Sequence, residues 1–439
     1  MRMNKGLELW KKALGIIPGG NGLLSKRPER YAPDIWPTYY DNAKGCKVTD
    51  LDGRTYIDMA QMGIGTAILG YSDDDVNSYV IESINKGVNT TLNTAEEPKL
   101  AELLLDIDQF AGGVKFARGG GEALQIAIRI ARAYTKKEKI LFSGYHGWSD
   151  WYLAANLSST SNLKNHLLDG LEPLGVPSGL NDTVRGFKFN DVRDFKQKIE
   201  NNDKEIAAVI IEGARGTLPT KNFIEEIQNF CEQNKCLFIT DEITCGWRSA
   251  YGATYKNLNY VPDMVTYGKA MGNGFAISAV VGKEEIMDSA QDTFISSSFW
   301  TERVGFAAAV ATLKKMKELK TWQHISTIGT YLTSGISNAG KKAGLEVSVG
   351  EFTSLPSFNI KSKFDKDVIE TLFIQEMLKR NYLASTIIYP SQCHTKEIID
   401  DYLQNVQEVF QIIRSLINKN QIQNALESNV RSDSFKRLT

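Results

Sequence analysis

Short apolar runs alternate with stretches of helical periodicity along the middle of this chain, and this alternation restricts the fold more than any other feature. The runs are rich in β-branched residues and too short for helices, so each predicts a buried strand. Helical stretches at 122–134 and 222–234 separate some of them. This order predicts an α/β fold with a mostly parallel sheet flanked by helices. The runs lie at 114–117, 139–143, 206–211, 236–240, 264–267 and 276–282.

The pattern changes near residue 320, which indicates a second domain. Two weak strand patterns, LEVSVG and SFNIKS, lie there among longer helical patterns. Near the start, Asp52-Gly53 between alternating residues predicts a hairpin. We expect residues 154–186 to form a long loop. We therefore expect four parts: an N-terminal segment of helix and hairpin that packs with the small domain (1–65), a large α/β domain (66–320), a small α+β domain (321–420) and a loose polar tail (421–439).

Composition argues against several classes of protein. The formal net charge is −1, which gives no reason to expect a nucleic-acid or membrane partner. The five cysteines include no CxxC pair and the four histidines form no cluster, so we expect no metal site and a reducing compartment. Leu7, Trp10, Leu14 and Ile17 recur at helical spacing, which predicts an amphipathic first helix and not a signal peptide. We expect a soluble, cytoplasmic protein.

Two ionisable residues follow consecutive apolar runs. Asp241 comes directly after 236–240, and Lys269 comes just after 264–267. Because open α/β sheets bind ligands at the carboxyl ends of their strands, we expect this carboxylate and this amine at one edge. Pyridoxal phosphate needs a lysine that forms a Schiff base with its aldehyde and a carboxylate that pairs with its protonated ring nitrogen. A strand-end salt bridge is the alternative that these two residues alone allow.

Three further features lie at the ends of predicted strands. A glycine run with Gly120 and Gly121 separates a strand from a helix, where free N–H groups bind phosphate, although tight turns use the same residues. Tyr145 and His146 follow the next strand, and such residues either stack on a flat ring or cap the core. Glu212 ends the run 206–211, either as a site residue or as a solvated carboxylate.

The order of these motifs along the chain is more specific than any one motif alone. The chain carries, in sequence, IPGG, DLDGRTYIDM, ILGY, GGEA, AIRIARAYT, GYHGW, AAVIIE, DEITCGWR, PDMVTYGKAMGNG and GFAAAVATL. This series resembles the class III, fold-type-I pyridoxal-phosphate-dependent aminotransferases, and among them the glutamate-1-semialdehyde 2,1-aminomutase-like proteins. The resemblance runs from residue 17 to a weak match in YPSQCHTKEIIDDYL near the end. It implies a large domain with a seven-stranded, mostly parallel sheet and a smaller α+β domain.

The resemblance also implies a role for each candidate site residue. Lys269 corresponds to the Schiff-base lysine and Asp241 to the partner of the ring nitrogen. The cofactor would pass through its pyridoxamine form, and the active sites would be shared within a homodimer. The other cofactor-binding residues implied are Ile243 and Tyr145, which stack on the ring, Gly120 and Gly121, which bind the phosphate, and His146 and Glu212 at the same edge. Ser298 would reach the phosphate of the neighbouring subunit, and Thr301 is a shifted alternative for this role.

Departures from the family pattern concern the substrate. Gly119 and Gly121 stand where the family usually has hydroxyl residues, and Gly213 stands where it often has proline. SSSFWTERVG replaces an aminomutase-like Ser-Gly-Asn-Pro. We predict amino-group transfer between a small-molecule donor and a carbonyl acceptor of unknown identity, with the 2,1-aminomutase reaction as the named alternative. A catalytically silent cofactor-binding regulator and a pyridoxal-phosphate enzyme of another type, such as a decarboxylase, are further alternatives; the retained lysine and aspartate argue against the first.

A basic segment follows the Pro-Gly-Gly turn near the start. In the aminomutase-like relatives this segment lies near the substrate and supplies a cation, and counting from Gly20 places Lys26 at that position. The resemblance therefore implies that Lys26 or Arg27 binds an acidic group of the substrate. A lysine acts as a point charge and not as a two-pronged clamp, so the group is either a carboxylate or a phosphate. A solvated basic loop is the alternative.

Overall fold

The chain forms two compact units in the computed structural model, which describes residues 5–167, 170–199 and 203–432. Unit 1 combines residues 1–73 with 324–439, and unit 2 is the continuous segment 74–323. The boundaries therefore lie a few residues after the predicted 65/66 and 320/321. No helix within the described ranges is long and apolar enough to cross a membrane.

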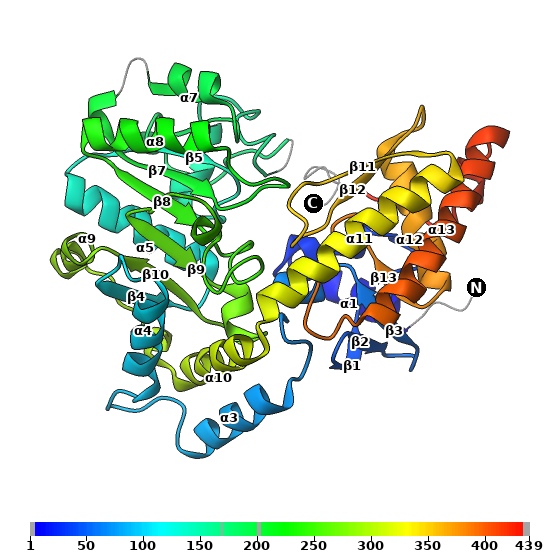
Figure 1. Ribbon diagram of the computed structural model, residues 1–439, viewed down its shortest axis with the longest axis horizontal. Helices are drawn as coiled ribbons and strands as arrows, with labels where there is room; N and C mark the ends of the chain where they lie inside the picture. Colours follow the sequence, from blue (N-terminus) through cyan, green and yellow to red (C-terminus); the bar gives the residue numbers. More distant parts are fainter. Residues whose placement is uncertain (1–4, 168–169, 200–202, 433–439) are drawn as a thin grey trace. The chain divides into compact units, whose positions relative to one another are not determined.

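Unit 2 is built on a seven-stranded sheet flanked by helices (Figure 1). Its order is β4-β10-β9-β8-β7-β5-β6, and only β10 runs antiparallel to its neighbours. This confirms the predicted mostly parallel sheet. The strands are β4 (Gly113–Ala117), β5 (Lys139–Ser143), β6 (Val184–Gly186), β7 (Ile206–Glu212), β8 (Leu237–Asp241), β9 (Met264–Tyr267) and β10 (Ser278–Gly282).

The register of the parallel strands aligns three polar residues in one row. Glu212 of β7 is opposite Asp241 of β8, and Asp241 is opposite Thr266 of β9. Ser143, the last residue of β5, is opposite Ile211, so the chain that leaves β5 begins beside Glu212. The carboxyl edge of the sheet therefore gathers polar groups from sequence positions more than a hundred residues apart.

Helices cover the sheet because their apolar residues recur on one side. In α5, Ala123, Ala127, Ile130 and Ala131 are fully buried, and the helix packs on β4, β7, β8, β9 and β10. Helix α8 packs on β7 and β8. The helices of unit 2 are α3 (Asp74–Asn85), α4 (Glu96–Ile107), α5 (Gly120–Thr135), α6 (Asp150–Leu153), α7 (Val192–Ile199), α8 (Lys221–Asn234), α9 (Glu284–Asp288) and α10 (Arg303–Leu319).

The region 154–186 was predicted to be one long loop, and this was wrong at its end. It contains two single-turn helices, η3 (Ala154–Asn156) and η4 (Ser178–Leu180), and it ends in strand β6 at the edge of the sheet. A three-residue strand carries too short an alternation to be read from the sequence. Residues 168–169 of this region lie outside the described ranges.

Unit 1 combines a four-stranded sheet, a two-stranded sheet and helices. The predicted hairpin is present: β2 and β3 pair around Gly53, whose φ of 82° suits glycine. Strand β13 pairs in parallel with β3, with Tyr382 opposite Ile57. Its elements are α1 (Lys5–Leu14), β1 (Tyr40–Lys44), β2 (Lys47–Asp50), β3 (Thr55–Met59), α2 (Met62–Gly65), α11 (Thr321–Ala343), β11 (Glu346–Val349), β12 (Phe358–Lys361), α12 (Lys366–Lys379), β13 (Tyr382–Ala384) and α13 (Lys396–Lys419).

The predicted polar tail, 421–439, is packed over its described part and is not loose there. Ile422 is fully buried in the core of unit 1. Arg431 forms ion pairs with Asp367 (2.8 Å) and Glu370, and the N–H of Ser432 donates to the carbonyl of Glu29 (2.9 Å). Residues 433–439 lie outside the described ranges.

Candidate active site

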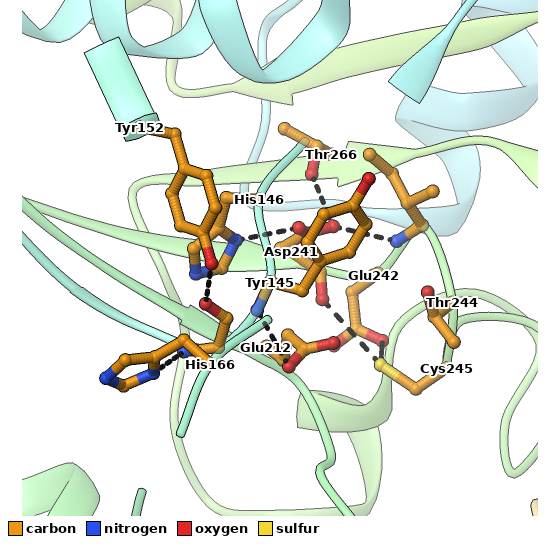
Figure 2. A network of polar contacts seen from close by, with 12 residues as sticks. Tyr145, His146, Tyr152, His166, Glu212, Asp241, Glu242, Thr244, Cys245 and Thr266 are labelled. Carbon is orange, nitrogen blue, oxygen red and sulfur yellow. Dashed lines mark hydrogen bonds and ion pairs between the residues drawn. The ribbon is translucent and has the colours of Figure 1, made fainter. Parts of the chain in front are cut away.

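Asp241 lies at the centre of the polar row and is held by three donors (Figure 2). Its Oδ1 accepts from the N–H of Ile243 (3.0 Å) and from the Thr266 hydroxyl (3.2 Å), and its Oδ2 lies 2.8 Å from His146 Nδ1. The carboxyl group is almost completely buried. Each carboxylate oxygen accepts more than one bond, so Asp241 keeps capacity for a further N–H donor.

His146 is buried and shares its Nδ1 with Asp241. Its Nε2 has no hydrogen-bond partner among the described residues. An imidazole that donates from Nδ1 to a carboxylate leaves Nε2 as the bare nitrogen, which suits this apolar position. His146 therefore fixes the orientation of the Asp241 carboxylate from one side.

Lys269 begins a single helical turn, η7 (Lys269–Gly272), directly after β9. Its φ of 43° lies in the left-handed region, which a lysine rarely adopts outside a constrained site. Its Nζ donates to the Thr244 hydroxyl at 2.8 Å. The pKa of Lys269 is lowered because protein surrounds the amine, and the charges of Asp241 and Glu212 oppose this only in part.

The predicted phosphate turn opens helix α5. The Glu122 carboxylate accepts from the N–H groups of Arg118 (2.9 Å) and Gly119 (2.8 Å), which satisfies the turn before the helix. The N–H groups of Gly120 and Gly121 have no partner among the described residues. An added Cβ at Gly120 would lie 2.8 Å from Ile243 Cδ1. A larger residue there would require Ile243 to shift, and two free donors remain at a helix N-terminus.

Ile243 and Tyr145 are the two predicted ring-stacking residues. Ile243 is buried and contacts the Gly120 position, while Tyr145 is about 40% exposed. Figure 2 draws Tyr145 beside Asp241, and its pKa is raised by burial and by the charges of Asp241 and Glu212. Both residues therefore lie at the same sheet edge as Asp241.

Glu212 is the third carboxylate of the edge, and it is paired and not solvated. Its Oε2 accepts from the N–H of Tyr145 (3.2 Å) and forms an ion pair with Arg215 Nη1. Arg215 also donates through Nη2 to the carbonyls of Asn165 and His166. Glu212 therefore fastens the loop after β5 to the loop after β7.

Ser298 and Thr301 are the remaining predicted cofactor residues. They occupy the exposed turn η9 (Ser298–Thr301), and the Thr301 hydroxyl donates to the Ser298 carbonyl (3.2 Å). Arg118 fastens the turn through the Phe299 carbonyl (2.6 Å). Within the described ranges, neither hydroxyl bonds to another predicted cofactor residue.

Lys26 and Arg27 belong to unit 1. Lys26 ends the turn η1 (Leu24–Lys26) and is exposed. Arg27 is partly buried, and its guanidinium lies against the Gly19 backbone, where an added Cβ would be 1.8 Å from Nη2. The loop is therefore ordered by its own contacts.

Four residues of the site were not singled out from the sequence: Thr244, Glu242, Thr266 and Arg215. Thr244 and Glu242 were visible inside DEITCGWR, but strand-end position alone does not tell which side chain faces the lysine. Thr266 was hidden within a strand, and Arg215 within a loop of weak pattern.

The model of the class-III aminotransferase family matches residues 30–410. The chain belongs to the class III aminotransferases. It is an enzyme of amino-group transfer whose family uses pyridoxal phosphate and small-molecule substrates.

Two curated relatives and two solved structures illustrate the similarity. The chain is 29% identical to a 3-aminobutyryl-CoA aminotransferase of Cloacimonas acidaminovorans (strain Evry), over 95% of the chain and 99% of the relative. It is 30% identical to a glutamate-1-semialdehyde 2,1-aminomutase of Alkaliphilus oremlandii (strain OhILAs), over 92% and 98%.

The solved structures share the fold. The FumI protein of Sphingopyxis sp. MTA144, in a form with pyridoxal phosphate, has a TM-score of 0.85 and 23% identity over 99% of this chain and all of that chain. An omega-transaminase from Sphaerobacter thermophilus has a TM-score of 0.81 and 24% identity over 94% and 98%. These neighbours confirm the predicted fold class.

The residues of this aminotransferase fit pyridoxal phosphate. Free N–H groups at Gly120 and Gly121 suit its phosphate, and Ile243 packs against Gly120. The fixed Asp241 carboxylate suits its ring nitrogen, and the Lys269 amine suits its aldehyde. All of them lie in unit 2.

Proposed function

We propose that this class III aminotransferase works through Lys269 and Asp241, with Gly120, Gly121, Tyr145, His146, Glu212 and Ile243 around the cofactor. The observation that carries the proposal is the placement of the Lys269 amine. It meets the neutral Thr244 hydroxyl and not a carboxylate, and its pKa is lowered by the surrounding protein. Such an amine is available as a nucleophile and as a base.

When bound, pyridoxal phosphate supplies a carbonyl carbon that carries the amino group from donor to acceptor, and a ring that draws electrons. Asp241 would hold the proton on the ring nitrogen, because a buried carboxylate beside the ring favours its protonated form. His146 and Thr266 keep that carboxylate in place. Lys269 Nζ would remove a proton from the carbon that bears the donor's amino group and deliver it to the carbonyl carbon of the cofactor, and in the acceptor half it would carry a proton in the reverse direction.

The test is spectral. Purified protein with pyridoxal phosphate is mixed with single amino compounds, and the visible band of the bound cofactor is followed. A donor should bleach this band, and a carbonyl acceptor should restore it. Nitrogen transfer without release of carbon dioxide separates this reaction from a decarboxylation. A protein that binds cofactor but responds to no amino compound would contradict the proposal.

The donor panel should include α-amino acids, β-amino acids and β-aminoacyl thioesters. The last class is motivated by the name of the 3-aminobutyryl-CoA aminotransferase relative. The 2,1-aminomutase reaction is the second candidate because a relative of similar identity carries that name. In that case a single amino aldehyde would be rearranged without an added acceptor.

Lys26 or Arg27 is proposed to bind an acidic group of the substrate. Support comes from their place after the Pro-Gly-Gly turn and from the contact that orders Arg27 against Gly19. Lys26→Met and Arg27→Met should be assayed once a substrate is known. One of them should raise KM for the acidic substrate without changing cofactor absorbance. Unchanged KM in both would show that the loop has a structural role only.

We propose a homodimer in which Ser298, or Thr301, reaches the partner's phosphate. Phe294 and Phe299 are 84% and 67% exposed on either side of Ser298, and such large apolar side chains favour burial against a second copy. Light scattering should give twice the chain mass. Ser298→Ala or Thr301→Ala should weaken cofactor retention in the dimer, whereas a stable monomer with full activity would contradict the proposal.

We also propose that the protein works in the cytoplasm. The supporting observation is that all five cysteines are free thiols in the structure. Fractionation of cells of the source organism would test this.

A further inference from the structure

Glu242 is a buried carboxyl beside Asp241 that the proposed chemistry does not use. It is fully buried, and both of its side-chain partners are neutral groups. Its Oε1 lies 2.6 Å from the Thr254 hydroxyl, and its Oε2 lies 3.3 Å from Cys245 Sγ. Thr254 begins the turn η6 (Thr254–Asn257) and is also buried. A charged carboxylate in this position would be costly.

Thr254 has two oxygen partners within hydrogen-bond distance but only one hydroxyl proton. The Thr254 hydroxyl oxygen lies 2.6 Å from Glu242 Oε1 and 3.1 Å from the carbonyl oxygen of Gly213. A hydroxyl has one proton, and a carbonyl can only accept. If Thr254 donates to Gly213, the proton in the shorter contact must belong to Glu242.

The electrostatic surroundings agree with this assignment. Burial raises the pKa of Glu242 to about 8, with the Asp241 charge acting in the same direction, although the bonds from Thr254 and Cys245 lower it. Figure 2 shows Glu242 beside Asp241 and Cys245. Five titratable groups that face Glu242 are acids: Asp241 of β8, Cys245 of the following turn, Tyr255 of η6, Tyr260 of the loop before β9, and Tyr267 of β9.

Gly213 connects this network to the active site. An added Cβ at Gly213 would lie 2.1 Å from Glu242 Oε1 and 2.4 Å from the Thr254 hydroxyl, so only glycine allows this approach. The Gly213 N–H donates to the Asp241 carbonyl at 3.0 Å. Gly213 also directly follows Glu212. The backbone here therefore joins the end of β7 to the end of β8.

We propose that Glu242 is a neutral carboxylic acid that donates its proton to Thr254 and, through Thr254, holds the Gly213 backbone beside Asp241. Glu242 is thus a positioning residue. On ionisation it would attract the Thr254 proton, and the Gly213 carbonyl would lose its donor. This inference rests on the proposed function only where turnover is measured, since the melting experiment requires no activity.

The melting temperature of the protein, measured against pH, tests whether Glu242 carries a proton in the folded chain. With a pKa of about 8 in the folded chain and an ordinary value of 4.5 in the unfolded chain, Glu242 holds a proton only in the folded state between these values. Wild-type stability therefore falls as the pH rises through this window. Glu242→Gln keeps a neutral donor and does not titrate. The difference between its melting temperature and that of the wild type should therefore increase from about pH 5 to about pH 8 and stay constant at higher pH.

Glu225→Gln is the matched control, since Glu225 is on α8 of the same unit and its side chain is 54% exposed. Its difference from wild type should be flat, because Glu225 lies on the surface and outside the network of Glu242, Thr254 and Gly213. A flat difference for Glu242→Gln as well would overturn the proposal. If that variant does not fold, infrared spectra of the wild type decide: a carboxylic-acid band that titrates near pH 8 supports the proposal, and its absence overturns it.

Turnover tests the positioning role. Ionisation with a pKa of about 8 leaves about 25-fold less neutral Glu242 at pH 9.5 than at pH 7.5. The activity of the wild type should fall by up to that factor relative to Glu242→Gln over this range. Parallel profiles would overturn the positioning role. Absence of turnover in both proteins would instead contradict the proposed function, and the melting comparison would still stand.

Discussion

Lys269 and Lys283 lie at opposite edges of the same sheet, and they meet opposite surroundings. Lys269 follows β9 at the carboxyl edge and donates to the neutral Thr244 hydroxyl at 2.8 Å. Lys283 follows the antiparallel β10 and so lies at the amino edge, where its Nζ is 2.6 Å from Asp263 Oδ1. The pKa of Lys269 is lowered by burial. Burial also lowers the pKa of Lys283, but the hydrogen bond and the charge of Asp263 outweigh burial, so this pKa is raised overall.

The amino edge is also hollow, which makes the comparison instructive. A cavity of about 640 Å³ there is lined by Lys137, Cys231, Asp263 and Lys283, among others. Two of its lysines have direct partners: Lys283 pairs with Asp263, and Lys137 donates to the Asn234 carbonyl at the end of α8. Space and charge alone therefore do not mark a reactive site. What distinguishes the carboxyl edge is an amine kept away from direct contact with the carboxylates near it.

Replacing each lysine by alanine should give the largest difference in activity between the two edges of the sheet. Lys269→Ala should abolish both turnover and the visible band of the bound cofactor, because the amine supplies the covalent link and the base. Lys283→Ala, measured in the same assays, should leave both unchanged. A Lys269→Ala protein with the wild-type band and full activity would remove Lys269 from the site.

Asp241→Asn should have the next largest effect. It removes a buried charge while its donors remain, a loss that typically costs about 3–5 kcal/mol. Since about 1.4 kcal/mol of barrier is tenfold in rate, turnover should fall at least about a hundredfold with some cofactor still bound. Steady-state kinetics at saturating substrate would measure this. A loss below about threefold would show that another group keeps the ring nitrogen protonated.

Thr244→Val removes the neutral hydrogen-bond partner of Lys269 at the carboxyl edge. A hydrogen bond between neutral groups contributes about 0.5–1.5 kcal/mol, so turnover should fall by up to about tenfold. The rate at which apoprotein captures pyridoxal phosphate should fall as well, and stopped-flow absorbance would follow it. Thr244→Ser keeps the hydroxyl and should recover most of both rates. Equal behaviour of valine and serine would show that the hydroxyl has no role.

Lys283→Met should have the smallest effect and serves as the reference for the amino edge. Its side chain is 40% exposed and that of Asp263 is 20% exposed, and such pairs contribute about 0–1 kcal/mol. Chemical denaturation should therefore show a free energy of unfolding lowered by no more than about 1 kcal/mol. A larger loss would mean that Lys283 also supports the packing of the cavity.

The sequence predicted the sheet and the candidate site for a simple reason. Strands that are buried on both faces are almost purely apolar, so the first polar residue after each one, such as Asp241, stands out. The parallel register then aligns Glu212, Asp241 and Thr266 without further information. Lys269 follows by the same logic one strand later.

Side-chain partnerships were not predictable in this way. Thr254 reaches Glu242 from twelve residues further along the chain, and Arg215 turns back to Glu212 through a loop without periodicity. Strands β1, β6 and β13 were missed because short or exposed strands have no apolar run. The packing of Ile422 and Arg431 was missed because a few apolar residues in a polar segment resemble a tail.

The order in which unit 1 is assembled has a consequence for synthesis. Its parallel pair joins β3, which ends at Met59, to β13, which begins at Tyr382, so 322 residues lie between the two strands. A ribosome adds about 5–20 residues per second, so β3 waits roughly 15–65 s for its neighbour. During that interval the continuous unit 2 can fold, while the first hairpin carries an open edge. Nascent chains of this protein should therefore bind chaperones through their first 73 residues until the last strand emerges.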